Sequence, residues 1–431
     1  MKKTPIVLIL VGTTLILAAV LIGVLIYMRN QPSPQRGIQP LIEIARYEPD
    51  SSKWGLNFPN QYSTFLLTKD NKARTTFGGS EPYSKLESDP RLVTLFAGMP
   101  FSIDYNEERG HMNSLTDVRE TKRVNEKTPG TCYSCKTANS PGLWDQMGAE
   151  EFFKTPFAKL GEKIDQPIGC ANCHEANTMR LIVTNPALEE ALADMGKDWR
   201  TFTRQEMRSI VCANCHVEYY FKGEGKYLTF PWDRGLSADN IAEYYNEIGF
   251  KDWDHAMTGA PMIKIQHPEY ELYTNNSTHY RAGVACADCH MPYIRDGAAK
   301  FSSHDVKSPL FTPEQSCGAC HTDVTYVVER VNQIQQQVRE VMDVATDALV
   351  EAIQAIEKAS QDPNANADLL EEARQLHREA QLRVDFINAE NSMGFHNPEE
   401  ALRVLAKATD LARQAQLKAI QASALVLQAS K

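Results

Sequence analysis

The chain begins with one long apolar segment. No charged residue occurs from Ile6 to Met28, and Lys2 and Lys3 precede this stretch. A helix rising about 1.5 Å per residue over this length spans the hydrocarbon core of a bilayer. The two lysines favour an N-terminus on the cytoplasmic side. Because large side chains at its end leave no cleavage site, we predict an uncleaved anchor at residues 1–30, with a cleaved signal peptide as the alternative. After a proline-rich linker at 31–45, the rest of the chain is expected on the outer face of the cytoplasmic membrane, exported to the periplasmic or extracytoplasmic side.

The C-terminal region, residues 322–431, has helical periodicity. Apolar residues recur at steps of three and four from Val324 to Ile356, which predicts a long amphipathic helix. The segment Asp362–Asn366 interrupts the pattern, and further helices are expected at 368–388 and 398–423. Such an apolar face needs a partner, which is either the following helices or a second copy of the chain.

The remaining segment, 46–321, contains few alternating patterns that would indicate strands. We therefore predict a mainly α fold in which helices and loops surround bound cofactors. The composition is that of a globular protein, with 42% hydrophobic and 23% charged residues. The net charge of −10 argues against a nucleic-acid partner, which would require a basic surface.

All ten cysteines of the chain occur in CxxC pairs. Four pairs are followed directly by histidine, and C-x-x-C-H is the attachment pattern of c-type haem. A zinc ribbon or a disulfide framework would not require that histidine. The pattern therefore predicts five covalently bound haems c. The pairs are Cys132/Cys135, Cys170/Cys173, Cys212/Cys215, Cys286/Cys289 and Cys317/Cys320, and the histidines are His174, His216, His290 and His321.

The first pair differs from the others, because Lys136 follows it where the other pairs have histidine. A lysine binds a metal only as the neutral amine, so iron would have to displace its proton. The alternative is a degenerate motif without a proximal ligand. A unique ligand indicates a haem with a unique task, and we infer that the opposite face of this haem is open to a small molecule.

Seven histidines remain after the four proximal ones are assigned. If four haems carry two histidines each, four of the seven are distal ligands, and those haems carry electrons without binding substrate. His377 lies among charged residues, which favours a solvated helix face, and no motif surrounds His255. His396 directly precedes a predicted helix start at which Asn397 is the N-cap and Glu400 its capping-box partner.

These motifs resemble those of the pentahaem cytochrome c nitrite reductases, the ammonia-forming enzymes. The likeness runs from about Trp54 to the C-terminus and includes the CxxCK motif, the segment Cys212–Phe221 and the segment Lys264–Tyr270. It implies a multihaem cytochrome c fold, a catalytic haem at Lys136, electron transfer through the other four, and a homodimer formed by the long helices. It also implies distal ligands: His304 for the haem at Cys170/Cys173, His111 for Cys212/Cys215, His396 for Cys286/Cys289 and His279 for Cys317/Cys320.

The resemblance also implies the residues of the open haem face. Arg123 would bind nitrite oxygens, His267 would relay protons, and Tyr219 would position reduced intermediates. Arg119 competes with Arg123 for its place in the motif. A calcium ion beside the site would take the Glu218 carboxylate, the carbonyls of Tyr219 and Lys264, and the Gln266 side chain, which are oxygen donors of the kind calcium prefers.

The expected activity is the six-electron reduction of nitrite to ammonium. The alternatives are an electron-transfer cytochrome without enzymatic activity, or a related reductase acting mainly on hydroxylamine or sulfite. The electron donor is expected to be a cytochrome, either in the membrane and linked to quinol oxidation or soluble. The apolar segment contains no cofactor motif, so it is expected to anchor the protein rather than to oxidise quinol.

Overall fold

The computed structural model describes residues 17–18, 20–23 and 40–429, with side chains up to residue 423. The chain divides into a unit of residues 1–43 and a compact unit of residues 44–431, which is described here. Most of the predicted anchor and linker lies outside the described residues. Within the described ranges, no helix is both long enough and apolar enough to cross a membrane.

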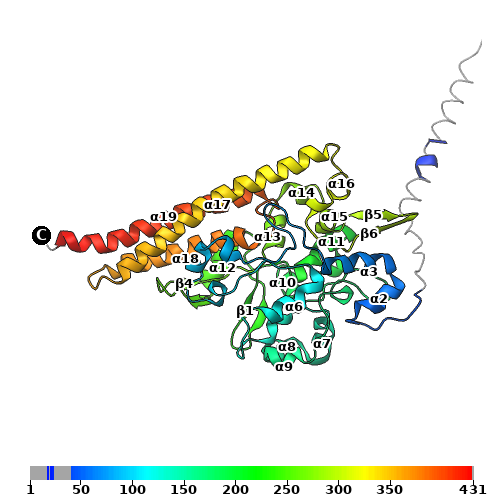
Figure 1. Ribbon diagram of the computed structural model, residues 1–431, viewed down its shortest axis with the longest axis horizontal. Helices are drawn as coiled ribbons and strands as arrows, with labels where there is room; N and C mark the ends of the chain where they lie inside the picture. Colours follow the sequence, from blue (N-terminus) through cyan, green and yellow to red (C-terminus); the bar gives the residue numbers. More distant parts are fainter. Residues whose placement is uncertain (1–16, 19, 24–39, 430–431) are drawn as a thin grey trace, which may run out of the picture. The chain divides into compact units, whose positions relative to one another are not determined.

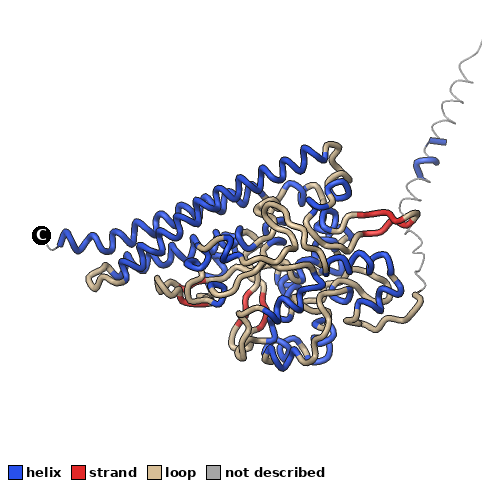
Figure 2. The backbone as a smooth tube through the Cα atoms, in the orientation of Figure 1, coloured by secondary structure: helices blue, strands red, loops and turns tan. Residues whose placement is uncertain are grey.

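Short helices connected by loops make up the first part of the compact unit (Figures 1 and 2). Side-chain caps start several of them; for example, Thr203 and Glu206 form a capping box at α11, with Thr203 N donating to Glu206 Oε2 at 2.7 Å. The helices are α2 (Ser51–Asn57), α3 (Pro59–Leu66), α4 (Lys85–Ser88), α5 (Arg91–Leu95), α6 (Ser114–Glu120), α7 (Ser140–Met147), α8 (Ala149–Lys154), α9 (Phe157–Gly161), α10 (Pro186–Asp194), α11 (Arg204–Ile210), α12 (Ala238–Glu247), α13 (Glu269–Thr274), α14 (Thr278–Arg281), α15 (Cys286–His290) and α16 (Pro313–Ser316). Short 3₁₀ turns lie between them at η1 (Leu67–Lys69), η2 (Pro100–Ser102), η3 (His111–Asn113), η4 (Gly130–Tyr133), η5 (Cys170–Asn172), η6 (Trp199–Thr201), η7 (Cys212–Asn214) and η8 (Pro309–Phe311).

Strands in the described chain form small antiparallel hairpins, shown in red in Figure 2. Two of them hold the segments that carry predicted site residues. Tyr219 directly precedes β1, and Lys264 comes two residues after the end of β4. The pairs are β1 (Tyr220–Lys222) with β2 (Tyr227–Thr229), β3 (Trp253–Asp254) with β4 (Pro261–Met262), and β5 (Tyr293–Asp296) with β6 (Ala299–Ser302).

Three long helices form the C-terminal part, and they pack against one another in Figure 1. They are α17 (Val324–Ser360), α18 (Ala367–Ala389) and α19 (Pro398–Ala429), which confirms the mainly helical fold and the predicted interruption after α17. Asn397 does cap α19, because its Oδ1 accepts from Glu400 N at 3.4 Å. The predicted reciprocal half of the capping box is wrong: the Glu400 carboxylate pairs with Arg403 Nε at 2.6 Å instead.

One hydrophobic core joins the long helices to the preceding region. Buried Leu92 and Ile263 belong to the same cluster as Val338 of α17 and Phe386 of α18. Residues 46–321 and 322–431 therefore do not fold as independent domains. The positions of the site residues depend on the long helices as well as on their own loops.

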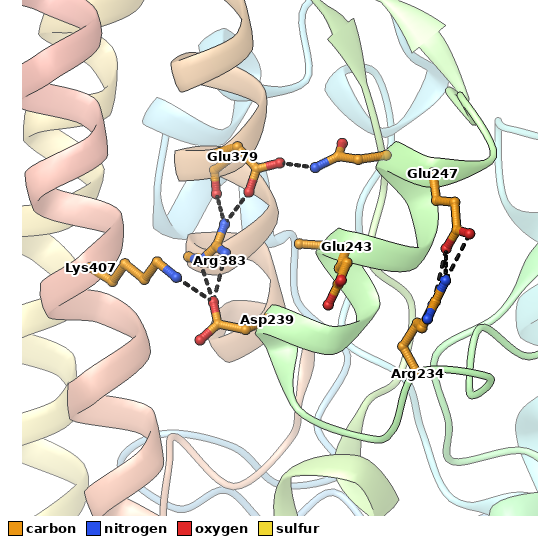
Figure 3. Close-up of a pocket in the computed structure, with 9 residues that line it drawn as sticks. Arg234, Asp239, Glu243, Glu247, Glu379, Arg383 and Lys407 are labelled. Carbon is orange, nitrogen blue, oxygen red and sulfur yellow. Dashed lines mark hydrogen bonds and ion pairs between the residues drawn. The ribbon is translucent and has the colours of Figure 1, made fainter. Parts of the chain in front are cut away.

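Ion pairs fasten α12 to the long helices at the cleft shown in Figure 3. Asp239 accepts from Arg383 at 2.6 Å and from Lys407 at 2.8 Å, and Arg383 also binds Glu379 at 2.6 Å. The cleft has a volume of about 600 Å³ and is lined by none of the predicted site residues. Its paired charges serve to attach α12 rather than to form the predicted site.

The prediction that His377 lies on a solvated face is wrong. Its side chain is completely buried on α18, with the His255 ring 5.0 Å away. The neighbouring Arg378 is also buried, and its guanidinium donates to Pro261 O and Phe250 O, each at 2.7 Å. Charged neighbours suggested a surface, but this arginine faces inward, where it donates to the carbonyl of Pro261 in β4 and to that of Phe250.

Candidate haem and active site

The CxxC motif at Cys286/Cys289 lies on the short helix α15, and the other four lie on tight turns that bring the thiols and the following residue together. Backbone bonds from His174 N to Cys170 O (3.0 Å), from His216 N to Cys212 O (2.9 Å) and from His321 N to Cys317 O (2.9 Å) close these turns. No disulfide bond joins any of the ten cysteines, all of which lie within the described residues. A turn that presents two thiols and an imidazole side by side has the donors that covalent haem attachment needs.

Cys320, in the fifth motif, differs from the other nine predicted haem cysteines. Its side chain is exposed to solvent, whereas the other nine are partly buried. It lies in the short connection between α16 and α17, where the neighbouring Gly318 and His321 are exposed as well. A haem attached there would lie at the surface of the single chain.

In three pairs of histidines, the two rings are separated by the distance expected for imidazoles that bind one metal ion from opposite sides. Imidazole–metal bonds of about 2 Å on each side would separate the ligating nitrogens by about 4 Å and the ring centres by about 6 Å. The separations between ring centroids agree with that spacing, and the pairs are those that the resemblance implies. They are His174 with His304 (6.2 Å), His279 with His321 (6.4 Å) and His290 with His396 (6.3 Å). These residues therefore fit haem.

The fourth predicted pair, His111 with His216, shows an electrostatic interaction but not the ring spacing of the other three pairs. Burial lowers the pKa of His111 to about 4, and the charge of His216 adds to this effect, so the two rings share one environment. The ring that lies 6.4 Å from His216 is that of His267. The structure thus brings the predicted fourth pair into one neighbourhood without the facing geometry of the other three.

The third motif lies at the centre of the five. Cys135 of the first motif donates to Asn214 O of the third at 3.6 Å, and its thiol adjoins that of Cys215. On the other side, the thiols of Cys212 and Cys286 are neighbours, which places the fourth motif against the third. Cys173 of the second motif also interacts electrostatically with the third. Haems attached at these positions would form a continuous path.

Lys136 pairs with Glu108, a residue that no sequence motif indicated. The two side chains form an ion pair that is largely shielded on the lysine side, where 17% of the side chain is exposed. Burial lowers the pKa of Lys136, but the Glu108 carboxylate outweighs burial and the pKa is raised overall. The amine would have to leave this carboxylate and lose its proton before it could bind iron.

The structure separates the two candidate arginines. Arg119 donates to Gly161 O at 3.1 Å and to Ile164 O at 2.7 Å, so its guanidinium is occupied by loop carbonyls. Arg123 lies close enough to Lys136 and Glu108 for their charges to interact. Arg119 contacts the first motif only through the Tyr133 ring, 6.0 Å away, so of the two it is Arg123 whose charge acts on Lys136 and Glu108.

Tyr219 and His267 lie in the same neighbourhood. Burial raises the pKa of Tyr219, and the thiols of Cys135 and Cys132 contribute next. Burial lowers the pKa of His267 to about 4, partly offset by Glu269, whose Oε1 is 3.9 Å from His267 Nδ1. Glu269 lies only two residues after His267, but nothing in the sequence pattern separated it from an ordinary helix-start carboxylate.

The predicted calcium ligands are adjacent in space. Glu218 is fully buried, and its carboxylate accepts from Tyr245 OH at 2.7 Å and from Gln266 N at 2.6 Å. The Gln266 side chain in turn donates to Lys264 O at 3.0 Å. Burial raises the pKa of Glu218 well above its ordinary value. A buried carboxylate among carbonyl oxygens fits a hard divalent cation, which would supply the missing positive charge.

Comparisons with known proteins agree with this geometry. A family model for cytochrome c552 matches residues 50–429. A cytochrome c-552 of Parabacteroides distasonis is 41% identical over 387 residues, covering 87% of this chain and 77% of that protein. The cytochrome c nitrite reductase subunit NrfA of Nitratidesulfovibrio vulgaris is 37% identical, covering 83% of this chain and 77% of its own length.

The fold is likewise that of a solved nitrite reductase. The catalytic subunit of the Desulfovibrio desulfuricans cytochrome c nitrite reductase, described with two calcium sites, superimposes with a TM-score of 0.84 at 36% identity and 88% coverage of both chains. The chain therefore belongs to the cytochrome c552 family, the family of the pentahaem cytochrome c nitrite reductases.

Proposed function

We propose that this chain is a pentahaem cytochrome c nitrite reductase that reduces nitrite to ammonium at the Lys136 centre. The observation that carries the proposal is the gathering of Arg123, Tyr219 and His267 beside the one haem motif that lacks histidine. The reaction consumes six electrons and eight protons, so it needs both an electron supply and proton donors. Four bis-histidine haems, with His111, His279, His304 and His396 as distal ligands, would provide that supply.

The haem would supply an iron that binds nitrite and passes electrons one at a time. The guanidinium of Arg123 would hold the nitrite oxygens through its planar fork of N–H donors. His267, neutral in its buried position, would relay protons to the substrate, and the Glu269 carboxylate, 3.9 Å from His267 Nδ1, would orient its ring. Tyr219 would orient partly reduced species through its hydroxyl group. Calcium held at Glu218, Tyr219, Lys264 and Gln266 would fix the two segments that carry Tyr219 and His267.

The remaining parts of the proposal concern assembly and location. The protein is proposed to be exported, anchored through its N-terminal segment, and to receive electrons from a cytochrome. The long helices would also bury their outer apolar positions in a homodimer: Val344, Leu417 and Ile420 are each more than half exposed in the single chain.

Steady-state turnover with a reduced dye tests the activity, with nitrite, hydroxylamine and sulfite as separate substrates. We expect nitrite to be reduced fully to ammonium, and a clear preference for either other substrate would favour the related reductase. Intact mass should show five haems, and electron paramagnetic resonance of the oxidised protein should show a high-spin centre. A spectrum without that signal would favour a pure electron carrier. The Lys136→His variant should keep five haems but change the rate and the high-spin signal.

A further inference from the structure

The ammonium group of Lys264 is buried in a cage of aromatic rings. Its Nζ lies 5.1 Å from the ring centroid of Phe96, 5.0 Å from that of Phe101 and 5.3 Å from that of Tyr105. Asp385 of α18 completes the cage, because its two oxygens lie 3.0 and 2.9 Å from Nζ. One Asp385 oxygen also accepts from Ile265 N at 2.9 Å, so this carboxylate holds both the side chain and the backbone of the segment that leads to His267.

Phe101, one of these rings, also supports Arg123. The guanidinium carbon of Arg123 lies 4.0 Å from the Phe101 ring centroid, closer than any other cation–ring contact in the described chain. The Phe101 ring is itself held edge-on by Tyr105, with centroids 5.0 Å apart and planes at 85°. Phe101 therefore contacts the side chain of Arg123 and the cation that begins the Lys264–His267 segment.

The hydrogen bonds of Arg123 leave its outer edge free. Its Nε donates to Thr121 Oγ1 at 3.0 Å, and that hydroxyl donates to Asp104 Oδ2 at 2.7 Å. Within the described residues, the two Nη groups of Arg123 have no protein acceptor. Stacking fixes the plane of a guanidinium, and the bond at Nε fixes its rotation within that plane. The two outer nitrogens are then available as a fork for an oxyanion.

We propose that Phe101 is a positioning residue that sets the Arg123 guanidinium relative to the Lys264–His267 segment, and so selects nitrite over uncharged substrates. This inference rests on the proposed function. A ring that contacts both cations keeps the anion-binding arginine and the proton-relaying histidine at a fixed separation. An aliphatic side chain would fill part of the space but would offer no π face to either cation.

The Phe101→Leu variant tests this role, with Phe96→Leu as its matched control. Phe96 borders the same lysine cage but makes no cation–π contact with Arg123, so it controls for loosening of the cage. We expect Phe101→Leu to raise the KM for nitrite, and the Kd for nitrite measured by the Soret difference spectrum of the oxidised enzyme, by about five- to tenfold. The kcat/KM for hydroxylamine, which is uncharged at neutral pH, should change much less. Phe101→Tyr, which keeps the ring face, should restore nitrite affinity.

The outcomes separate this inference from the function on which it rests. Wild-type enzyme that fails to reduce nitrite would refute the proposed function. With an active wild type, equal effects of Phe101→Leu and Phe96→Leu on nitrite affinity would overturn the role of Phe101. So would equal losses for nitrite and hydroxylamine, or a failure of Phe101→Tyr to restore affinity. If Phe101→Leu does not assemble with five haems, the comparison of Phe101→Tyr with wild type still decides, because a role through the ring face predicts near-normal nitrite affinity.

Discussion

Replacing Asp385 by asparagine should destabilise the protein strongly, because it leaves a buried cation without its partner. Both side chains of the Lys264–Asp385 pair are 1% exposed. Removing one member of a buried ion pair costs about 3–5 kcal/mol. Loss of the lysine proton at pH 7 would cap the penalty at about 4.6 kcal/mol. The three surrounding rings offset part of the loss, so we expect about 3 kcal/mol.

Guanidinium denaturation of the holoprotein, followed by circular dichroism, measures this loss. The control is Glu351→Gln, which breaks the Arg413–Glu351 pair between α17 and α19, whose side chains are 44% and 49% exposed. That exposed pair should contribute no more than about 1 kcal/mol. The double variant Lys264→Met/Asp385→Asn should recover much of the stability, since it removes the unpaired charge. The reasoning fails if Asp385→Asn is no more harmful than Glu351→Gln, or if the double variant is less stable than Asp385→Asn.

Three further predictions concern the site and its surroundings. His267→Asn should reduce kcat for nitrite at least about tenfold while mass spectrometry still shows five haems, because the variant lacks the proton relay; unchanged turnover would exclude His267 from the mechanism. Glu218→Ala should lower the calcium content measured by plasma emission spectroscopy, and normal content would refute the ligand assignment. Burial, aided by His255, lowers the pKa of His377 to about 3. The unfolded chain then binds a proton below pH 6.5 that the folded protein does not bind, so stability falls between about pH 6.5 and 3 by up to about 1.4 kcal/mol per pH unit. His377→Gln should show a flatter dependence in acid denaturation, and an unchanged slope would contradict this account.

The periodicity of apolar residues, together with the residues that start or interrupt helices, predicted the C-terminal helices well. The three- and four-residue steps from Val324 onward correspond to α17, and Pro398 begins α19 as expected. These features depend on neighbours in sequence, so a single chain suffices to recognise them. The predicted haem motifs also depend only on neighbours in sequence, because two cysteines and the residue that follows them lie close together along the chain. The motif alone does not give its depth in the fold, and the exposure of Cys320 became visible only in the structure.

Contacts between distant segments could not be predicted in the same way. The burial of His377 depends on loops about 120 residues earlier in the chain, including Thr258, whose hydroxyl lies 3.3 Å from His377 Nδ1. Likewise, Glu108 reaches Lys136 only because the loop before His111 folds back over the first motif. Phe101 belongs to a short apolar stretch that reads as ordinary core, and only its place beside Arg123 distinguishes it.

Because the CxxC motif at Cys212/Cys215, the third of the five, adjoins the first, second and fourth, the proposed electron path branches there. The first motif joins the others through Cys135 and Cys215, so the third centre is the junction at which current from the second and fourth must merge. A variant that impairs electron transfer at the third centre would leave the second and fourth centres reducible, but few electrons would reach the first. The extent of haem reduction and the rate of turnover, which ordinarily change together, would then be affected differently in that variant.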